Sequence, residues 1–343
     1  MSNSLNINQK EVIAQYKLNE SEIREINGLL NDICLQYDSS ESEELYRNLN
    51  VLAAELPRSL RTFINHFKLE EKSGCCLIQG YPVNDELIGM TPVHWNERKA
   101  PSPTLHEEII FALVGTLLGQ PFGWETQQNG YVIHDILPID GHENEQISSG
   151  SEEPIWWHIE DAFHPYRPDY VGLMCLRNLE KIPTTYVSMD QLELDPKDLE
   201  VLFQPHYVIF PDQSHKSYFN NKNNINFSFI EELTENPPKV PILFGNPTEP
   251  YMRLDPYFMD EPETFKAKKA FQALIEEIDK KLMDITLQPG DICFIDNYKA
   301  VHGRKPFNAK YNGKDRWLKR ICITRDLRKS RDRRKASSSP IIY

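Results

Sequence analysis

The sequence predicts a mainly β fold with flanking helices (α+β), in which an antiparallel sandwich or barrel carries its helices chiefly at one end of the chain. Two features of its 343 residues support this prediction. The first 70 residues place apolar side chains three and four positions apart, which is the spacing of an amphipathic helix. From Gly130 onward, short runs rich in β-branched and aromatic residues alternate with turn residues, a series typical of sandwiches and barrels.

The expected helices share an apolar stripe at helical spacing and lie at 22–37, 44–67, 105–119 and 262–286. Pro262 and Glu263 suit the first turn of the last helix, because proline needs no amide donor there and a carboxylate complements the helix dipole. The expected strands are short apolar runs between turn residues, at 74–82, 131–139, 155–163, 170–178, 184–189, 206–210, 240–244, 251–255, 291–298 and 316–327.

We expect a single domain over 1–343. In it, a mostly helical region, 1–114, packs on a β core, 115–328. Segment 211–238 is polar, Asn-rich and too long for a hairpin turn, so it is either a surface loop or a lid over a pocket. Residues 329–343 form a basic tail that need not be ordered. The N-terminal helices either support the core or form a contact between two copies of the chain. The sequence therefore leaves open whether the protein is a homo-oligomer.

The composition favours a small-molecule partner. Aspartate and glutamate total 51 against 38 lysines and arginines, and a net charge of −13 makes a poor binder of nucleic acid. A cationic small molecule is the natural candidate. No apolar run is long enough for a membrane span, and the N-terminus lacks the pattern of a secretory signal. The six cysteines form no CxxC pair, which favours reduced thiols in a cytoplasmic protein.

Two His-x-Glu pairs occur, about as many as this composition gives by chance, so their position must decide between them. In a strand, residues i and i+2 point to the same face, so His158 and Glu160 in the expected strand 155–163 can bind one ion. In a helix the same spacing makes the side chains diverge, which excludes His106 and Glu108.

A third candidate ligand, His302, follows the expected strand 291–298. Two imidazoles and one carboxylate from distant segments make up a facial triad, which leaves positions on Fe(II) open for a chelating co-substrate and O₂. Arg316 could pair with the far carboxylate of a dicarboxylate co-substrate. On the residues alone, structural roles for these side chains stay open. The HExxH, GxSxG and GxxxxGK[ST] signatures are absent from the sequence.

The stretch WHIEDAFHPYRPDYVGLMCLRN (157–178) resembles the iron-ligand region of the clavaminate synthase-like Fe(II)/2-oxoglutarate oxygenases. It is most similar to the branch that hydroxylates free L-amino acids such as asparagine, arginine and lysine. The resemblance includes 126–146 and VHGRKPF (301–307), and covers roughly residues 115–328. It implies a double-stranded β-helix, or jelly-roll, core and a reaction that needs Fe(II), 2-oxoglutarate and O₂ and releases succinate and CO₂.

The resemblance also implies a role for each matched residue. Those that match the iron ligands are His158, Glu160 and His302. Arg316 and Thr185 match the residues that bind the C5 carboxylate of 2-oxoglutarate, with Thr184 as the alternative register. Arg320 matches the arginine that receives the α-carboxylate of the substrate, and in a strand it shares a face with Arg316. Gln127, together with Glu160, matches contacts to the α-amino group. The acids that match contacts to a basic side chain are Asp212 and Asp255.

The chain departs from the arginine-specific pattern at one position. A second acid would follow two residues after Asp255, and this chain has Tyr257 there. A guanidinium favours a clamp of two acids, whereas one acid and an aromatic face can hold a compact ammonium. We therefore predict hydroxylation of C3 or C4 of free L-lysine, with arginine, ornithine or asparagine as alternatives.

Two other functions compete with this prediction. An oxygenase of the same fold acting on a carrier-bound or protein-bound residue would need a wide entrance, and Arg320 argues for a free α-carboxylate instead. A binding module without activity would have a damaged triad or would lack Arg316, and all four of these positions are intact.

Overall fold

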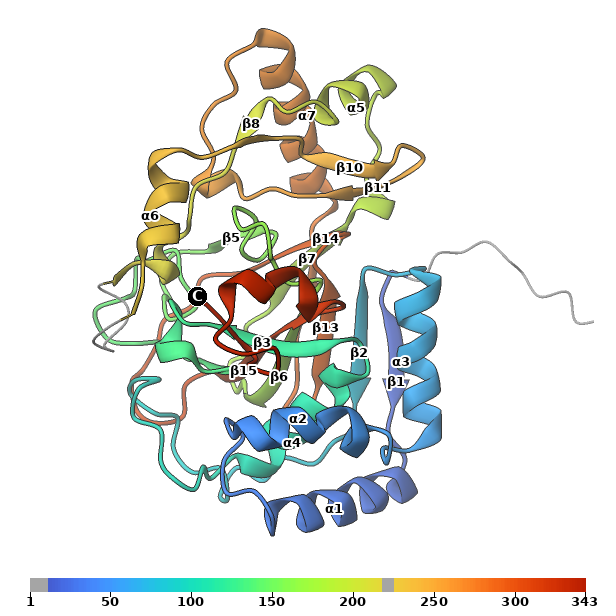
Figure 1. The fold of residues 1–343 in the computed structure, drawn as a ribbon, viewed down its shortest axis with the longest axis vertical. Coiled ribbons are helices and arrows are strands. Elements are labelled where there is room, and N and C mark those ends of the chain that lie inside the picture. Colours follow the sequence, from blue (N-terminus) through green and yellow to red (C-terminus); the bar gives the residue numbers. More distant parts are fainter. Residues whose placement is uncertain (1–11, 218–224) are drawn as a thin grey trace, which may run out of the picture.

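The computed structural model describes residues 12–217 and 225–343. Two sheets form the core (Figure 1). The larger sheet contains, in hydrogen-bonded order, β1 (Ala14–Lys17), β2 (Cys75–Gln79), β13 (Ile292–Asp296), β6 (Tyr170–Arg177), β15 (Trp317–Thr324), β3 (Gln120–Trp124) and β16 (Ile341–Ile342), with β4 (Ile133–Ile136) also paired to β15. The smaller sheet contains β12 (Met283–Ile285), β7 (Thr184–Ser188), β14 (Ala300–Arg304) and β5 (Ile155–His158). The predicted mainly β fold with a jelly-roll core is confirmed.

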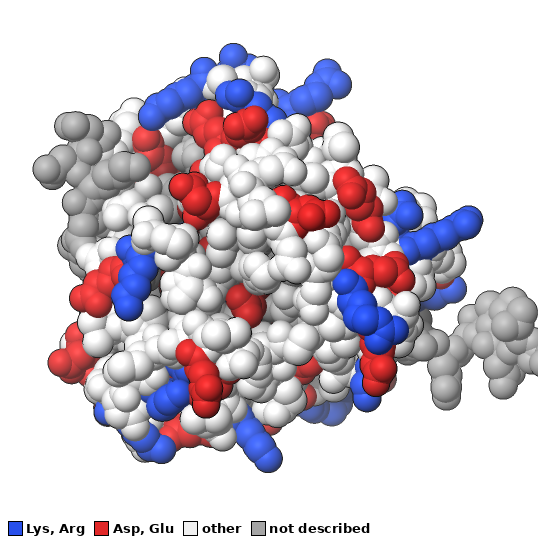
Figure 2. Space-filling view, turned by 90° about the horizontal axis from the view of Figure 1, so that it is seen from below, with Lys and Arg blue, Asp and Glu red and all other residues white. Residues whose placement is uncertain are grey.

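The N-terminal helices cover the outer face of the larger sheet. They are α1 (Glu20–Cys34), α2 (Glu43–Ala53), α3 (Arg58–Glu70) and α4 (Leu105–Thr116), and they share one hydrophobic cluster with β2, β6, β13 and β15. The expected helix at 44–67 is divided before Pro57, which has no amide hydrogen to continue it. Seen from below, acidic and basic side chains are interspersed among uncharged surface (Figure 2). None of the helices in the described part of the chain is long and apolar enough to cross a membrane.

Between β7 and β12, the described residues 189–217 and 225–282 form a layer over the outer face of the smaller sheet, at the top of Figure 1, which we call the 189–282 layer. Its elements are α5 (Pro196–Leu202), β8 (Tyr207–Val208), α6 (Ser228–Glu235), β9 (Lys239–Val240), β10 (Leu243–Asn246), β11 (Glu249–Met252) and α7 (Phe265–Lys281). Val187 and Val301 pack into this layer, whereas Tyr186 belongs to the cluster between the sheets. Since side chains alternate along a strand, His302, next to Val301, points inward.

The basic C-terminal segment is folded, which differs from the expected tail. Arg334 is 3% exposed, and its Nη1 donates to three backbone carbonyl oxygens between residues 336 and 339. Beyond it, β16 pairs in parallel with β3. The basic composition concealed the short apolar run at 341–342 that extends the larger sheet.

Segment 211–238 is described except for 218–224, so the part of the expected lid at 218–224 lies outside the described residues. The segment contains a 3-10 turn, Gln213–His215, and the helix α6. His215 is fully buried, so the beginning of the segment is anchored to the core.

Two glycines should respond to alanine with opposite signs. Gly290 has a φ of +90°, and a Cβ there would lie 1.7 Å from the carbonyl oxygen of Tyr81. Gly28, inside α1, has nothing within 4 Å of such a Cβ. We expect Gly290→Ala to lower the free energy of unfolding by about 3 kcal/mol or more. Gly28→Ala should raise it by about 0.5–1 kcal/mol. Denaturant titration measures both, and equal midpoints would contradict this account of Gly290.

Candidate active site

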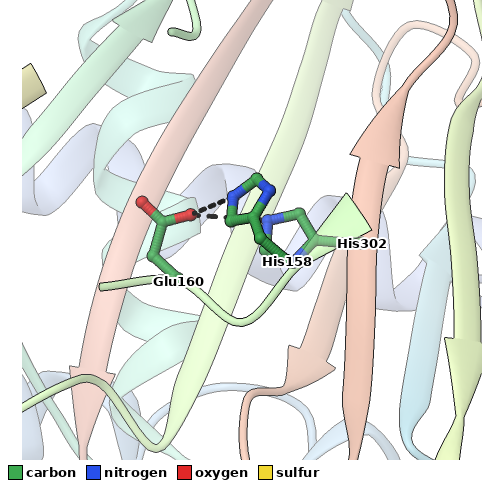
Figure 3. A group of neighbouring side chains, drawn as sticks. All are labelled: His158, Glu160 and His302. Carbon is green, nitrogen blue, oxygen red and sulfur yellow. Dashed lines mark ion pairs between the residues drawn. The ribbon is translucent and has the colours of Figure 1, made fainter. Parts of the chain in front are cut away.

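Three candidate metal ligands converge on the inner side of the smaller sheet (Figure 3). His158 ends β5 and His302 lies in the middle of β14, and these two residues are paired across the strands. Glu160 Oε2 lies 3.6 Å from His158 Nε2 and 3.4 Å from His302 Nε2. One ligand atom from each residue lies within 4.8 Å of the others, so a single ion could contact all three.

Glu160 reaches this position in a different way from the one predicted. β5 ends at His158, so Glu160 is not on the strand and strand alternation does not place it. Its backbone is instead bound by Asn297, in the turn between β13 and β14. Glu160 N donates to Asn297 Oδ1 at 2.8 Å, and Asn297 Nδ2 donates to Glu160 O at 3.0 Å.

The charges around Glu160 keep it ionised. Burial alone would raise its pKa, but Arg320 and the two imidazoles hold that pKa well below its usual range. Burial would lower the pKa of His158, yet Glu160 and Asp255 raise it to about 9. His158 Nδ1 lies 2.7 Å from the carbonyl oxygen of Trp156, which turns Nε2 toward Glu160. Two imidazoles and a carboxylate in this arrangement fit Fe(II).

Arg316 lies just before β15, is 8% exposed and lines the pocket beside the triad. Its Nη2 donates to Thr184 Oγ1 at 3.4 Å, and it forms no ion pair with an acid in the described part of the chain. Burial lowers its pKa to about 10. Thr184 lines the same pocket, whereas Thr185, the next residue of β7, points to the other face of the sheet. The sequence left the choice between Thr185 and Thr184 open, and the structure places Thr184 on the pocket side beside Arg316.

Arg320 lines the same pocket as Arg316, as their shared strand face predicted. Its Nη1 donates to Glu160 Oε1, and its Nη2 donates to Gln127 Oε1 at 2.8 Å. Gln127 is 2% exposed and does not line the pocket. Its Nε2 donates to Ser214 Oγ at 2.6 Å. Gln127 therefore links Arg320 to the 3-10 turn that follows Asp212. It lies behind Arg320 and not at the pocket surface, where a contact to the α-amino group was predicted.

Asp212 and Asp255 line the pocket from the 189–282 layer. Neither forms an ion pair with lysine or arginine among the residues that the structure describes. Burial raises the pKa of Asp255 to about 7; His158 opposes this shift and Asp212 adds to it. Tyr257 is 50% exposed and packs against the rings of Trp156 and Phe258 outside the pocket wall. Among the described residues, the site thus presents two acids that form no ion pair with lysine or arginine.

Several contributors were missed by sequence reasoning. Arg304 is a second buried arginine in the pocket wall, and it donates to the carbonyl oxygens of Ser151 and Glu153. Its position two residues after His302 could have revealed it, because the two share a strand face.

A second contributor, the buried pair of His215 and Asp161, has no sequence pattern that could have revealed it. His215 Nε2 lies 2.9 Å from Asp161 Oδ1, and Trp124 Nε1 donates to Asp161 Oδ2 at 2.6 Å. These side chains come from positions far apart in the sequence, and only the fold brings them together.

Residues 104–322 match the family model described as "Taurine catabolism dioxygenase TauD, TfdA family". The L-ornithine/L-arginine 3-hydroxylase of Catenulispora acidiphila is 43% identical over 92% of this chain and 95% of its own. The enduracididine beta-hydroxylase of Streptomyces hygroscopicus is 40% identical over 95% of this chain and 98% of its own. By contrast, the L-lysine 3-hydroxylase of C. acidiphila is 28% identical over 82% of this chain and 76% of its own.

A solved structure of an oxygenase in complex with a hydroxylated arginine is also similar to this chain. The non-heme iron oxygenase OrfP, in complex with Fe, succinate and (3S)-hydroxy-L-Arg, matches with a TM-score of 0.92 at 42% identity, over 96% of this chain and 99% of OrfP. Other OrfP structures hold Fe with alpha-ketoglutaric acid and Fe with L-Arg. The similarity therefore includes the N-terminal helices and the 189–282 layer as well as the ligand-bearing strands.

Proposed function

This chain belongs to the taurine catabolism dioxygenase TauD, TfdA family, and we propose that it hydroxylates a side-chain carbon, C3 or C4, of free L-arginine. It is a free amino-acid hydroxylase that uses Fe(II), 2-oxoglutarate and O₂. The sequence preference for lysine gives way to arginine, because the relatives with the higher identity are named for arginine, ornithine and enduracididine.

The observation that carries this proposal is the pair of pocket acids, Asp212 and Asp255. The preference for lysine relied on Tyr257 as an aromatic face for an ammonium, but Tyr257 lies outside the pocket wall. Two acids from separate segments can instead share the several donors of one guanidinium. A cation there would also relieve the repulsion between the two carboxylates, and ornithine is the second candidate because one relative is named for both substrates.

The other roles follow from the contacts described above. His158, Glu160 and His302 would hold the iron, and Arg316 with Thr184 would bind the far carboxylate of 2-oxoglutarate. When bound, the metal and 2-oxoglutarate supply the oxidation, in which O₂ is consumed, succinate and CO₂ form and one oxygen atom enters a substrate C–H bond.

Placement of the substrate is then the task of the protein. Arg320 would bind the α-carboxylate, with Gln127 holding its guanidinium from behind. Asp212 and Asp255 would hold the far end of the side chain. Because the substrate is fixed at both ends, the carbon that lies nearest the metal is the one hydroxylated, and a shift of about 1 Å would change the outcome.

A panel of free L-amino acids tests this proposal. Purified protein with Fe(II) and 2-oxoglutarate should release succinate fastest with arginine, then with ornithine, and NMR of the product should place the hydroxyl on C3 or C4. Lysine or asparagine as the best substrate would overturn the assignment to arginine, and no succinate with any free amino acid would favour a carrier-bound substrate.

Removing one pocket charge should change the amino-acid requirement selectively. Asp255→Asn should raise the KM for arginine about 100-fold, within the roughly 2–5 kcal/mol that follows loss of one partner of a buried charge pair. The KM for 2-oxoglutarate should stay within about twofold. Asp260→Asn, an exposed acid five residues further on, is the control and should change neither constant. Equal weakening of both substrates by Asp255→Asn would make Asp255 a structural residue.

A further inference from the structure

We infer that Asn297 is a positioning residue that fixes Glu160 relative to His302 and thereby sets the affinity of the triad for its metal. The inference rests on the metal site proposed above. Asn297 is fully buried, five residues before His302, in the turn that joins β13 to β14. It therefore belongs to the hairpin that carries one ligand while it binds the backbone of another.

The side-chain amide of Asn297 makes the hydrogen bonds to the Glu160 backbone that a neighbouring strand would make within a sheet. Its Oδ1 accepts from Glu160 N at 2.8 Å, and its Nδ2 donates to Glu160 O at 3.0 Å and to Pro168 O at 3.0 Å. The backbone N of Asn297 also donates to Asp169 O at 2.9 Å. His158 and His302 are placed by paired strands, but Glu160 lies beyond the end of β5. Among the described residues, the backbone of Glu160 hydrogen-bonds to Asn297 alone.

Other contacts hold the residues on either side of Glu160, but they do not bind the backbone of Glu160, which Asn297 binds. Ile159 N donates to Leu254 O at 2.9 Å, and the Arg253 guanidinium donates to backbone carbonyl oxygens of residues 162 and 163. Asp161 has a φ of +49°, a left-handed conformation that costs a residue other than glycine about 1 kcal/mol. The chain therefore turns sharply just after Glu160, a shape it would not keep without external support.

The chain offers a matched control in Asn178, in the turn after β6. Asn178 is 4% exposed, its Oδ1 accepts from Ile182 N at 2.9 Å, and its Nδ2 donates to the carbonyl oxygens of Ile182 and Leu287 at 3.0 and 3.1 Å. It makes the same three bonds as Asn297, but none to a candidate ligand. The two asparagines should contribute similarly to folding and differently to metal binding.

The experiment compares Asn297→Ser with Asn178→Ser, using Co(II) as the metal probe without 2-oxoglutarate or amino acid. Each change leaves two carbonyl oxygens and one amide without their partner, so both variants should melt below the parent protein. Only Asn297→Ser should weaken Co(II) binding, by about 10- to 100-fold, the range found when groups that orient metal ligands are removed. Co(II) affinity follows from its visible absorption and stability from thermal unfolding of the metal-free protein.

Equal Co(II) affinity in Asn297→Ser and the parent protein would overturn the inference, as would equal weakening in Asn178→Ser. Asn297→Asp covers the case in which Asn297→Ser does not fold, because it keeps the acceptor for Glu160 N. Its extra negative charge would by itself tighten cation binding, so weaker Co(II) binding must come from a displaced Glu160, and unchanged or tighter binding overturns the inference. His302→Ala tests the metal site separately from the role of Asn297. If this variant binds Co(II) as well as the parent protein does, the metal site itself is misassigned.

Discussion

Replacing His302 with alanine should lower succinate formation by at least about 1000-fold, because the metal supplies the oxidation and one of its three proposed protein ligands is lost. β14 is paired on one side with β5 and on the other with β7, so its backbone cannot shift to bring another residue of the strand into the vacated position. A coupled succinate assay measures the rate, and anaerobic titration with Fe(II) measures the affinity, which should fall together with it.

The control for this change is His106→Ala. His106 belongs to the other His-x-Glu pair, at the start of α4, and its alanine variant should keep both Fe(II) binding and turnover. Undiminished Fe(II) binding by His302→Ala would remove His302 from the ligand set, whatever the rate of turnover.

Arg316→Met should have the second largest effect, and its effects on binding and stability should run in opposite directions. The KM for 2-oxoglutarate should rise about 100- to 1000-fold, since a buried guanidinium that meets a carboxylate is worth several kcal/mol. The metal-free protein should melt at the same or a higher temperature, because Arg316 has no acidic partner among the described residues and an apolar side chain removes an uncompensated charge.

A second buried arginine provides the contrast. Arg177 is 1% exposed and donates to Asp85, Thr91 and the carbonyl oxygen of Gly89. Arg177→Met should lower the stability by about 1–3 kcal/mol, because Thr91 and the carbonyl oxygen of Gly89 lose their donor, and should leave the KM for 2-oxoglutarate unchanged. If instead Arg316→Met destabilises the protein and binds 2-oxoglutarate normally, Arg316 has a structural role.

The sequence predicted those features that depend on local periodicity or on matched motifs. The N-terminal helices and most of the strands were expected, since each depends on a pattern within a few residues of chain. The convergence of His158, Glu160 and His302 was expected from the motifs that resemble a known family. The route by which Glu160 arrives was not, because strand alternation fails once β5 ends at His158.

The remaining differences have physical reasons of the same kind. Thr184 and Thr185 are chemically alike, and only the register of β7 against β14 decides which one faces Arg316. Asn297 and His215 are single polar residues whose partners lie far away in the sequence, so no spacing signals them.

The acids proposed to contact the amino-acid side chain lie in the 189–282 layer, whereas the residues proposed to bind iron and 2-oxoglutarate lie on or beside the strands of the jelly roll. Oxygen activation and selection of the amino-acid side chain therefore depend on separate segments of the chain. Replacing this layer with that of a relative that prefers another amino acid should change the substrate specificity and leave the oxidation itself intact. Random mutagenesis confined to residues 189–282 should therefore suffice to change which amino acid is hydroxylated.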